Sequence, residues 1–153
     1  MLSVKFNKLT DEAKLPTRKH KMDAGIDVYS LETVRLAANS QKVIHTGIAL
    51  AKCPRRYVLQ VWPKSGLDAE FGLHTGAGII DCEYRGEILI LLKNMSEYIW
   101  EIEAGDAIAQ LVLLPCPGYE IELTEDTDET ERGDTGGITK TVTLNTKAEF
   151  KEE

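Results

Sequence analysis

Three features are missing from this sequence of 153 residues, and each absence narrows the class of protein. No apolar run approaches the roughly 20 residues that a membrane-spanning helix needs. Residues 1–5 alternate as in a strand and lack the charged start and apolar stretch of a secretion signal. There is also no basic excess, since the net charge is -7, and nucleic-acid binding needs a basic surface. We therefore expect a chain that binds neither membranes nor nucleic acid.

Metal-binding arrangements of cysteine and histidine are also missing from the sequence. Cys53, Cys82 and Cys116 have no Cys-x-x-Cys spacing, and the three histidines stand alone. An odd number of unclustered cysteines is typical of reduced thiols, and it disfavours a metal cluster. These residues predict a cytoplasmic protein, with the nucleus as the alternative in a eukaryotic or viral source.

The acidic charge is concentrated near the C-terminus. Eight acidic residues and one basic residue lie between 120 and 134, which accounts for the whole net charge of -7. Such a stretch is usually a solvated linker. Apolar residues become sparse after Thr124, and the composition of Gly133 to Gly137 is typical of a mobile arm. We expect a folded domain over residues 1–124, followed by an acidic linker and a flexible arm over 125–153.

Most of the chain has the pattern of short strands separated by turn residues. Such spacing predicts an all-β fold, either a sandwich or a barrel. Runs at 88–92 and 108–114 are apolar on both faces, so contacts with other subunits could cover them. The single helix start lies at Ser65–Glu70, where Ser65 and Asp68 could form a capping box. The expected strands are Leu2–Leu9, Asp27–Ser30, Thr33–Leu36, Gln41–Ala51, Tyr57–Trp62, Gly78–Asp81, Glu87–Asn94, Glu97–Glu103, Ala107–Pro115 and Glu120–Thr124.

Residues 77–87 combine an acid and an aromatic three positions apart, at a sharp turn between two strand-like runs. A carboxylate at a strand end, here Asp81, can position and deprotonate a water molecule. A tyrosine three residues later, Tyr84, can lay its ring against a ligand. The alternative is a hairpin whose polar residues only make the turn.

Five segments, taken together and in order, resemble the motifs of the trimeric dUTP diphosphatase (dUTPase) family. The resemblance extends over roughly residues 2–140, and the third segment matches at almost every position. Any one motif alone is weak. The segments are Asp23-Ala24-Gly25-Ile26-Asp27, Pro63-Lys64-Ser65-Gly66-Leu67, Gly78 to Glu87, Gly105 to Leu111, and Glu131-Arg132-Gly133 to Gly137.

The resemblance implies an enzyme that hydrolyses dUTP to dUMP and pyrophosphate, which keeps uracil out of DNA and supplies dUMP. Asp81 would orient the water that attacks the α-phosphorus. Asp27 would stand near the Mg²⁺ held by the triphosphate, through water molecules, because Mg²⁺ tends to keep part of its hydration shell. Without the other motifs, Asp27 could equally be a strand-end turn residue.

Phosphate contacts are implied for Lys64, Ser65, Gly66 and Gln110. A helix start offers free N–H groups to an anion, and Ser65 could also be a simple N-cap. The family usually has arginine where Lys64 stands, so the charge is retained while two-pronged hydrogen bonding is lost. Gln110 would donate to a phosphate oxygen, or it could face solvent from an edge strand.

Base and sugar contacts are implied around residues 76–84. Main-chain groups from Gly76 to Ile80, including Gly78 and Ile79, would pair with the uracil edge. Tyr84 would lie under the deoxyribose and leave no space for a 2'-hydroxyl. Thr75 and Leu89 occupy positions that flank the base in relatives, although Leu89 could equally be a core residue.

The fifth motif departs from the family pattern. Relatives have a phenylalanine that covers the base, whereas this chain has no aromatic residue there. With one residue inserted, Ile138 replaces that phenylalanine and Lys140 could contact the γ-phosphate. Arg132 and Gly137 are the other expected contacts in this arm.

The resemblance therefore implies a β-barrel of jelly-roll type, a homotrimer with sites between subunits, Mg²⁺ as cofactor, and a mobile C-terminal arm that closes over the nucleotide. Two alternatives stay open at this point. One is a deaminase of the same superfamily that acts on dCTP, and the other is a non-catalytic dUTP-binding regulatory protein.

Overall fold

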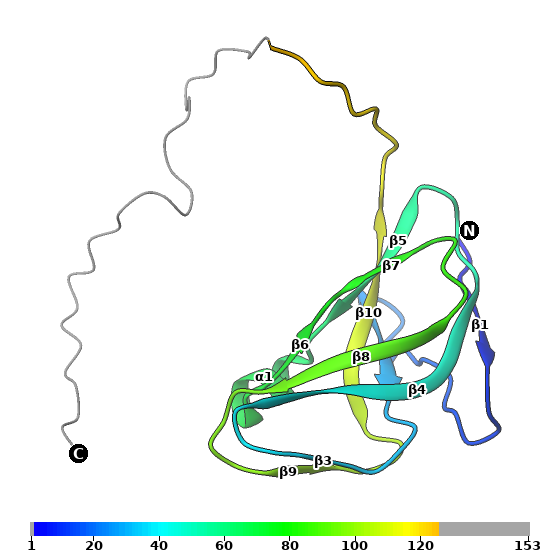
Figure 1. Ribbon diagram of the computed structural model, residues 1–153. Coiled ribbons are helices and arrows are strands. Elements are labelled where there is room, and N and C mark those ends of the chain that lie inside the picture. Colours follow the sequence, from blue (N-terminus) through cyan, green and yellow to red (C-terminus); the bar gives the residue numbers. More distant parts are fainter. Residues whose placement is uncertain (1, 126–153) are drawn as a thin grey trace. The chain divides into compact units, whose positions relative to one another are not determined.

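A computed structural model describes residues 2–125 (Figure 1). The chain divides after Tyr119, and the unit that precedes this point contains the strands. Its all-β character confirms the expected class. Within the described residues the elements are β1 (Lys5–Lys8), β2 (Gly25–Tyr29), β3 (Val34–Leu36), β4 (Ser40–Lys52), β5 (Tyr57–Trp62), α1 (Ser65–Phe71), β6 (Leu73–Gly76), β7 (Ile79–Asp81), β8 (Glu87–Asn94), β9 (Trp100–Ile102) and β10 (Ala107–Pro115).

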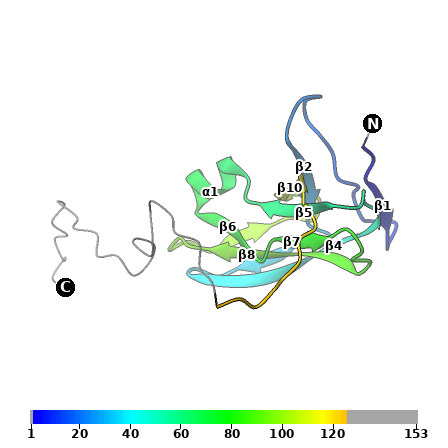
Figure 2. The same ribbon diagram turned by 90° about the horizontal axis from the view of Figure 1, so that it is seen from above.

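The strands form two four-stranded sheets and one two-stranded ribbon. The first sheet has the order β1-β4-β8-β6, the second has the order β2-β10-β5-β7, and β3 pairs with β9. Figure 1 shows β4 and β8 as long neighbouring strands, and Figure 2 shows the sheets as layers, with α1 near β6. All named strand pairs in the described residues are antiparallel. The sheets are open at β6 and β7, so the described residues do not form the closed barrel that was expected.

The hydrophobic core follows from the alternation of β4 and β8. Ile44 on β4 and Ile90 on β8 are opposite each other and fully buried. Complete burial of such a side chain contributes about 1.5–3 kcal/mol. The other face of β8 stays uncovered in the single chain, where Leu89 is 42% exposed beside an exposed Val43 on β4. The apolar run at 88–92 therefore has one buried face and one open face.

Two elements differ from the expected strands. Leu73–Gly76 forms β6, which pairs with β8 and was not predicted because its four residues lie directly between the helix and a turn. Conversely, no strand forms at Glu120–Thr124. The alternating Ile121 and Leu123 side chains are 88% and 101% exposed, and a strand needs a paired edge to satisfy its backbone.

The helix begins as predicted, but the capping box is absent. The N-cap residue is Lys64, and no side chain caps the helix. The Asp68 carboxylate instead lies 3.1 Å from the His74 ring nitrogen. α1, the single helix in the described part of the chain, has seven residues, and no helix there is long and apolar enough to cross a membrane.

Candidate active site

The predicted site turn connects strands of different sheets. Among the described residues β7 pairs with β5 alone, whereas β8 pairs with β4 and β6, so the two strands do not form the simple hairpin that was the alternative interpretation of this segment. The turn is held by its own backbone: Tyr84 N–H donates to Asp81 C=O at 3.0 Å. Arg85 donates to the carbonyls of Cys82 and Tyr84 at 2.9 and 2.8 Å. The two strands can therefore diverge from the turn and leave space between them.

The Asp81 carboxylate stands exposed at the end of β7. Within residues 2–125, no hydrogen bond or ion pair engages this side chain. Its oxygens are therefore available to a water molecule or a ligand, as a general base requires.

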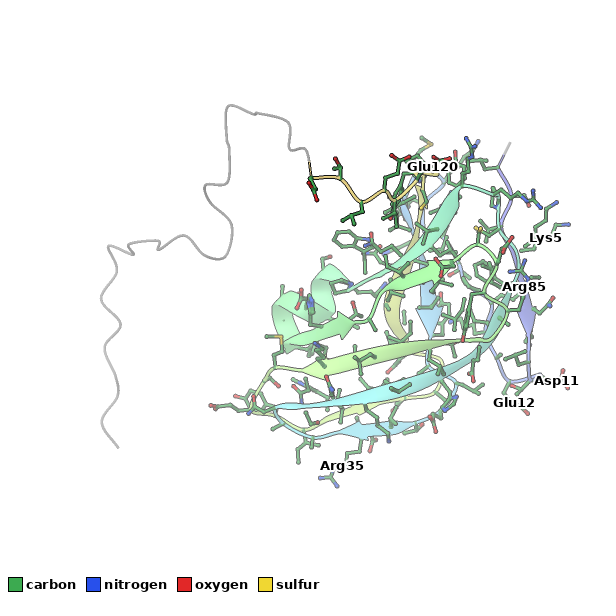
Figure 3. The ribbon with its side chains drawn as sticks, turned by 45° about the horizontal axis from the view of Figure 1, so that its top comes forward. Lys5, Asp11, Glu12, Arg35, Arg85 and Glu120 are labelled. Atoms are coloured by element: carbon green, nitrogen blue, oxygen red, sulfur yellow. The ribbon has the colours of Figure 1, made fainter. Side chains whose placement is uncertain are left out.

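The Tyr84 ring is positioned by the same turn. Its hydroxyl donates to the Glu87 carbonyl at 3.0 Å, and the side chain lies across Gly86. A Cβ added at Gly86 would lie 2.4 Å from the Tyr84 hydroxyl oxygen, so only glycine permits this position. Figure 3 shows Arg85, the neighbouring turn residue, well away from Arg35 on β3.

A pocket of about 230 Å³ opens between these strands, and we call it the β7–β8 pocket. The structure brings together here most of the residues expected to contact base and sugar. Thr75 and Gly76 are the exceptions, because both lie on β6, where Thr75 is buried opposite Leu92 and Gly76 lies opposite Leu91. The predicted residues that line the pocket are Gly78, Ile79, Ile80, Asp81, Tyr84 and Leu89.

The wall of this pocket contains the free edge of a sheet, because β7 is the last strand of its sheet. The Val61 N–H donates to the Gly78 carbonyl at 2.8 Å. In an antiparallel ladder the peptide groups of alternate residues face opposite sides. The N–H and C=O of Ile79 therefore face away from β5, where a strand edge presents unpaired donors and acceptors.

A histidine–carboxylate pair adjoins the pocket and was not predicted. Glu87, which lines the pocket, lies 2.8 Å from the His45 ring nitrogen. It also accepts the N–H of Gly47 at 2.8 Å and that of Thr46 at 3.2 Å. The hydrogen bond to Glu87 and then its charge raise the pKa of His45. Burial alone would raise the pKa of Glu87, but the bonds from His45 and Gly47 outweigh burial and lower that pKa.

A second group of predicted residues meets at β2, β10 and the end of β5. Asp27 of β2 lies opposite Gln110 of β10, and Gln110 lies opposite Trp62, the last residue of β5. Lys64 follows two residues later. These elements surround an opening of about 300 Å³, the β2–β10 cleft, which is lined by Lys19, Asp23, Ala24, Gly25, Asp27, Lys64 and Gln110.

Polar groups in this cleft are paired with one another. The Lys64 ammonium lies 2.6 Å from an Asp27 carboxylate oxygen, and both side chains are about a quarter exposed, at 28% and 26%. Gln110 donates to the Pro63 carbonyl at 3.0 Å. A Cβ at Gly25 would lie 2.2 Å from the Gln110 amide oxygen, so the glycine makes room for that side chain.

Ser65 and Gly66 are exposed at the start of α1. The first backbone bond of the helix runs from Asp68 N–H to Lys64 C=O at 2.9 Å. The preceding N–H groups of the first turn therefore have no acceptor within the helix. The remaining predicted contacts, Arg132, Gly137, Ile138 and Lys140, lie outside the described residues.

The two groups are far apart within one chain. β7 and β2 are the opposite edges of one sheet, with β5 and β10 between them. Asp81 lies opposite Val58 of β5, four residues from the level of Asp27. With about 4.8 Å between strands and about 3.3 Å per residue, Asp81 and Asp27 are roughly 20 Å apart. One copy of the chain cannot bring both residues to the same phosphate group.

Comparisons with known proteins agree with this fold. The dUTPase family model matches residues 11–141. A deoxyuridine 5'-triphosphate nucleotidohydrolase of Candida albicans is 40% identical over 136 residues, which cover 88% of this chain and 85% of that protein. One from a Picosynechococcus strain is 35% identical over 144 residues, covering 93% of this chain and 100% of that protein.

Solved structures of dUTPases have a similar fold. The dUTPase of Staphylococcus bacteriophage 80alpha with dUpNHpp has a TM-score of 0.81 at 30% identity, and the match covers 92% of this chain and 99% of that one. A variant dUTPase of phage phi11 of S. aureus, described with a structural Mg(II) ion, has a TM-score of 0.77 at 28% identity, covering 83% and 99%.

The fold and the names of these relatives define a β-sheet protein of the nucleotide-hydrolysing class. The match over residues 11–141 and the identity to curated relatives show that the chain belongs to the dUTPase family.

Proposed function

We propose that this chain hydrolyses dUTP to dUMP and pyrophosphate. The single observation on which this depends is the arrangement of the β7–β8 pocket: the Asp81 carboxylate, with no partner in the described residues, adjoins a free strand edge and the Tyr84 ring. The family match and the names of the relatives support the same substrate.

The reaction forms one bond and breaks one. Asp81 holds a water molecule and accepts its proton as the water oxygen bonds to the α-phosphorus. The bond between that phosphorus and the α,β-bridging oxygen breaks, and pyrophosphate leaves with the electron pair. The protein forms no covalent bond to the phosphorus, so most of the rate acceleration comes from positioning the water and the phosphate.

Uracil is selected by main-chain groups along the free edge of β7, around Ile79. A fixed order of donors and acceptors rejects cytosine, because a mismatched base leaves buried polar groups unpaired. The narrow pocket rejects the thymine methyl group less strongly. Tyr84 packs beneath the deoxyribose and excludes a 2'-hydroxyl.

Mg²⁺ fits the β2–β10 cleft only as a companion of the substrate. Among residues 2–125, no cluster of three or more histidine, cysteine, aspartate or glutamate side chains could hold a metal by itself. Mg²⁺ commonly binds through one or two carboxylates plus substrate phosphates, and keeps several waters. Asp27, which pairs with Lys64 through one carboxylate oxygen, would hold the ion through water molecules, and the bound ion would neutralise charge on the phosphates. Lys64, Gln110 and the N–H groups at Ser65 and Gly66 bind phosphate oxygens.

The active assembly is a homotrimer of these open-sheet, jelly-roll type domains, with sites between subunits. The separation of roughly 20 Å between Asp81 and Asp27 supports a site that takes the β7–β8 pocket from one chain and the β2–β10 cleft from another. The uncovered face at Val43 and Leu89 supports a further apolar contact between chains. The number three comes from the family resemblance. A cytoplasmic location is part of this proposal and agrees with the odd number and the scattered positions of the cysteines.

The decisive experiment measures pyrophosphate and ammonia from a panel of dUTP, dCTP, dTTP and UTP, with and without Mg²⁺. We expect pyrophosphate from dUTP, in a Mg²⁺-dependent manner, at catalytic concentrations of protein. Ammonia from dCTP would instead establish the deaminase, and binding of dUTP without turnover would establish a regulatory protein.

A further inference from the structure

An unusually basic loop stands beside the β2–β10 cleft. The sequence Arg18-Lys19-His20-Lys21 precedes β2 in a chain whose net charge is -7. The connection between β1 and β2, in blue, rises next to β2 in Figure 2. Only one of the four side chains, that of Lys19, belongs to a residue that lines the cleft.

The backbone fixes where Lys19 lies. Two residues before it, Thr17 forms a bridge to Asp27, with N–H to C=O distances of 3.2 and 2.7 Å. The Thr17 hydroxyl also bonds to the Tyr29 hydroxyl. Lys19 is therefore tied to the strand that presents Asp27.

A turn closes the loop on the other side of Lys19. His20 N–H donates to the Asp23 carboxylate at 2.8 Å, and Asp23 N–H donates to the His20 carbonyl at 3.1 Å. The Asp23 carboxylate accepts a hydrogen bond within this turn and forms no ion pair with Lys19.

Of the two lysines that line the cleft in the described part of the chain, Lys19 is the one without a partner there. Lys64 is paired with Asp27, and the Gln110 amide is bonded to Pro63. No hydrogen bond or ion pair engages the Lys19 side chain within residues 2–125. A polyphosphate that enters the cleft thus meets one ammonium group that can bind it without first breaking a protein contact.

We propose that Lys19 binds the β- and γ-phosphates of the nucleoside triphosphate and thereby sets the preference of this site for triphosphates over monophosphates. This proposal rests on the proposed function, because it assigns a further binding residue to the same site. It also explains how the site tolerates Lys64 in place of arginine: the lost second donor is replaced from a neighbouring loop by a charge-assisted contact.

The test compares Lys19→Met with Lys21→Met, a matched removal of charge from the same loop at a residue that does not line the cleft. We expect Lys19→Met to raise KM for dUTP about tenfold with little change in kcat, because a phosphate contact made in both ground and transition state is lost. The inhibition constant of dUMP, which lacks the outer phosphates, should not change. Lys19→Arg should restore the wild-type KM, and Lys21→Met should behave as wild type.

Calorimetric binding of an unhydrolysable α,β-imido dUTP, with and without Mg²⁺, separates this proposal from the proposed function. If the wild type binds the analogue but does not turn over dUTP, the proposed function fails while Lys19 is still tested by its effect on affinity. Equal affinities in wild type and Lys19→Met would overturn the Lys19 proposal alone. An equal loss of dUMP affinity would also overturn it, because the residue would then shape the whole site.

Discussion

The Asp81 carboxylate, which has no partner among residues 2–125, is the chemical centre of the proposed mechanism. Changing Asp81 to Asn removes the base and preserves the shape of the side chain. We expect kcat to fall by about a hundred- to ten-thousandfold, the usual range for a lost general base. Affinity for an unhydrolysable dUTP analogue should stay nearly constant. Stopped-flow pyrophosphate release and calorimetry measure the two quantities.

Glu83→Gln is the matched control for that change. Glu83 lies in the same turn and is exposed, and it does not line the β7–β8 pocket. This variant should keep wild-type turnover. Near-normal turnover in Asp81→Asn would remove Asp81 from the mechanism.

The His45–Glu87 pair makes part of the stability depend on pH. The pKa of Glu87 lies below its ordinary value of 4.5, so its contribution is complete above pH 4.5 and is lost as the pH falls through the lowered pKa. The pKa of His45 lies above its ordinary value of 6.5, so its contribution is complete below pH 6.5 and is lost as the pH rises through the raised pKa. The pair therefore stabilises the fold most between pH 4.5 and 6.5.

We expect His45→Gln to lower Tm most near the middle of this window, by at most about 2–4 °C because the pair is solvent-screened. The difference from wild type should shrink at alkaline pH. Differential scanning fluorimetry across pH 5–9 measures it, with His20→Gln as control. A difference that is constant with pH would contradict the assigned ion pair.

At the scale of elements, the turn between β7 and β8 sets the position of Tyr84. Gly86→Ala would place a methyl group 2.4 Å from the Tyr84 hydroxyl oxygen and displace the ring. We expect kcat/KM for dUTP to fall at least about tenfold, and the preference for dUTP over UTP to narrow, because the ring excludes the 2'-hydroxyl. Steady-state kinetics with both nucleotides test this.

Gly118→Ala is the control for the glycine substitution, since nothing lies within 4 Å of a Cβ at Gly118. Gly118→Ala should leave kcat/KM unchanged for both dUTP and UTP. If Gly86→Ala discriminates between dUTP and UTP as well as the wild type does, Tyr84 does not read the sugar.

The elements also show what the sequence can predict. Alternation located most strands, because a buried face demands apolar residues at every second position. It failed at Glu120–Thr124, where the pattern exists without a paired edge, and it missed β6, which is too short to show a period. Turn chemistry suggested a hairpin at Asp81–Gly86, but which sheet a strand joins depends on long-range pairing that local residues do not encode.

At the site, motif order identified the residues, and the structure supplied their partners. The pairing of Lys64 with Asp27 links residues 37 positions apart, so spacing alone could not reveal it. The sequence also could not predict that Gly25 makes room for Gln110, because that contact depends on the pairing of β2 with β10. His45 looked isolated in sequence because Glu87 lies 42 positions away.

At the scale of the whole molecule, the distance between the two groups predicts complementation between inactive chains. One chain has Asp81→Asn, and the other has Asp27→Asn with Lys64→Met, which removes both members of the ion pair together. Each alone should be nearly inactive. Co-expressed in equal amounts, they should recover about one quarter of wild-type activity, because random assembly gives that share of sites two intact halves.

Analytical ultracentrifugation of the mixture should give the same assembly as wild type. Activity no greater than the sum of the two parents would mean that each site is complete within one chain. The assumption of sites between subunits would then be wrong.

A second prediction at this scale concerns the C-terminal segment. A chain that ends before Glu131 should lose at least about tenfold in kcat/KM, because the resemblance assigns Arg132 and Lys140 to ligand contacts. Its Tm should change by less than about 2 °C, since the buried core cluster of the described residues lies between Ala13 and Leu111. Loss of folding on truncation would contradict this assignment.

The free edge of β7 has a consequence for the evolution of specificity. If the base is recognised by peptide groups, a substitution at Ile79 by any residue other than proline leaves the order of donors and acceptors unchanged, since all of them have the same backbone N–H and C=O. Discrimination against cytosine is then inherited with the architecture. Drift can change the turnover of such an enzyme far more readily than its choice of base.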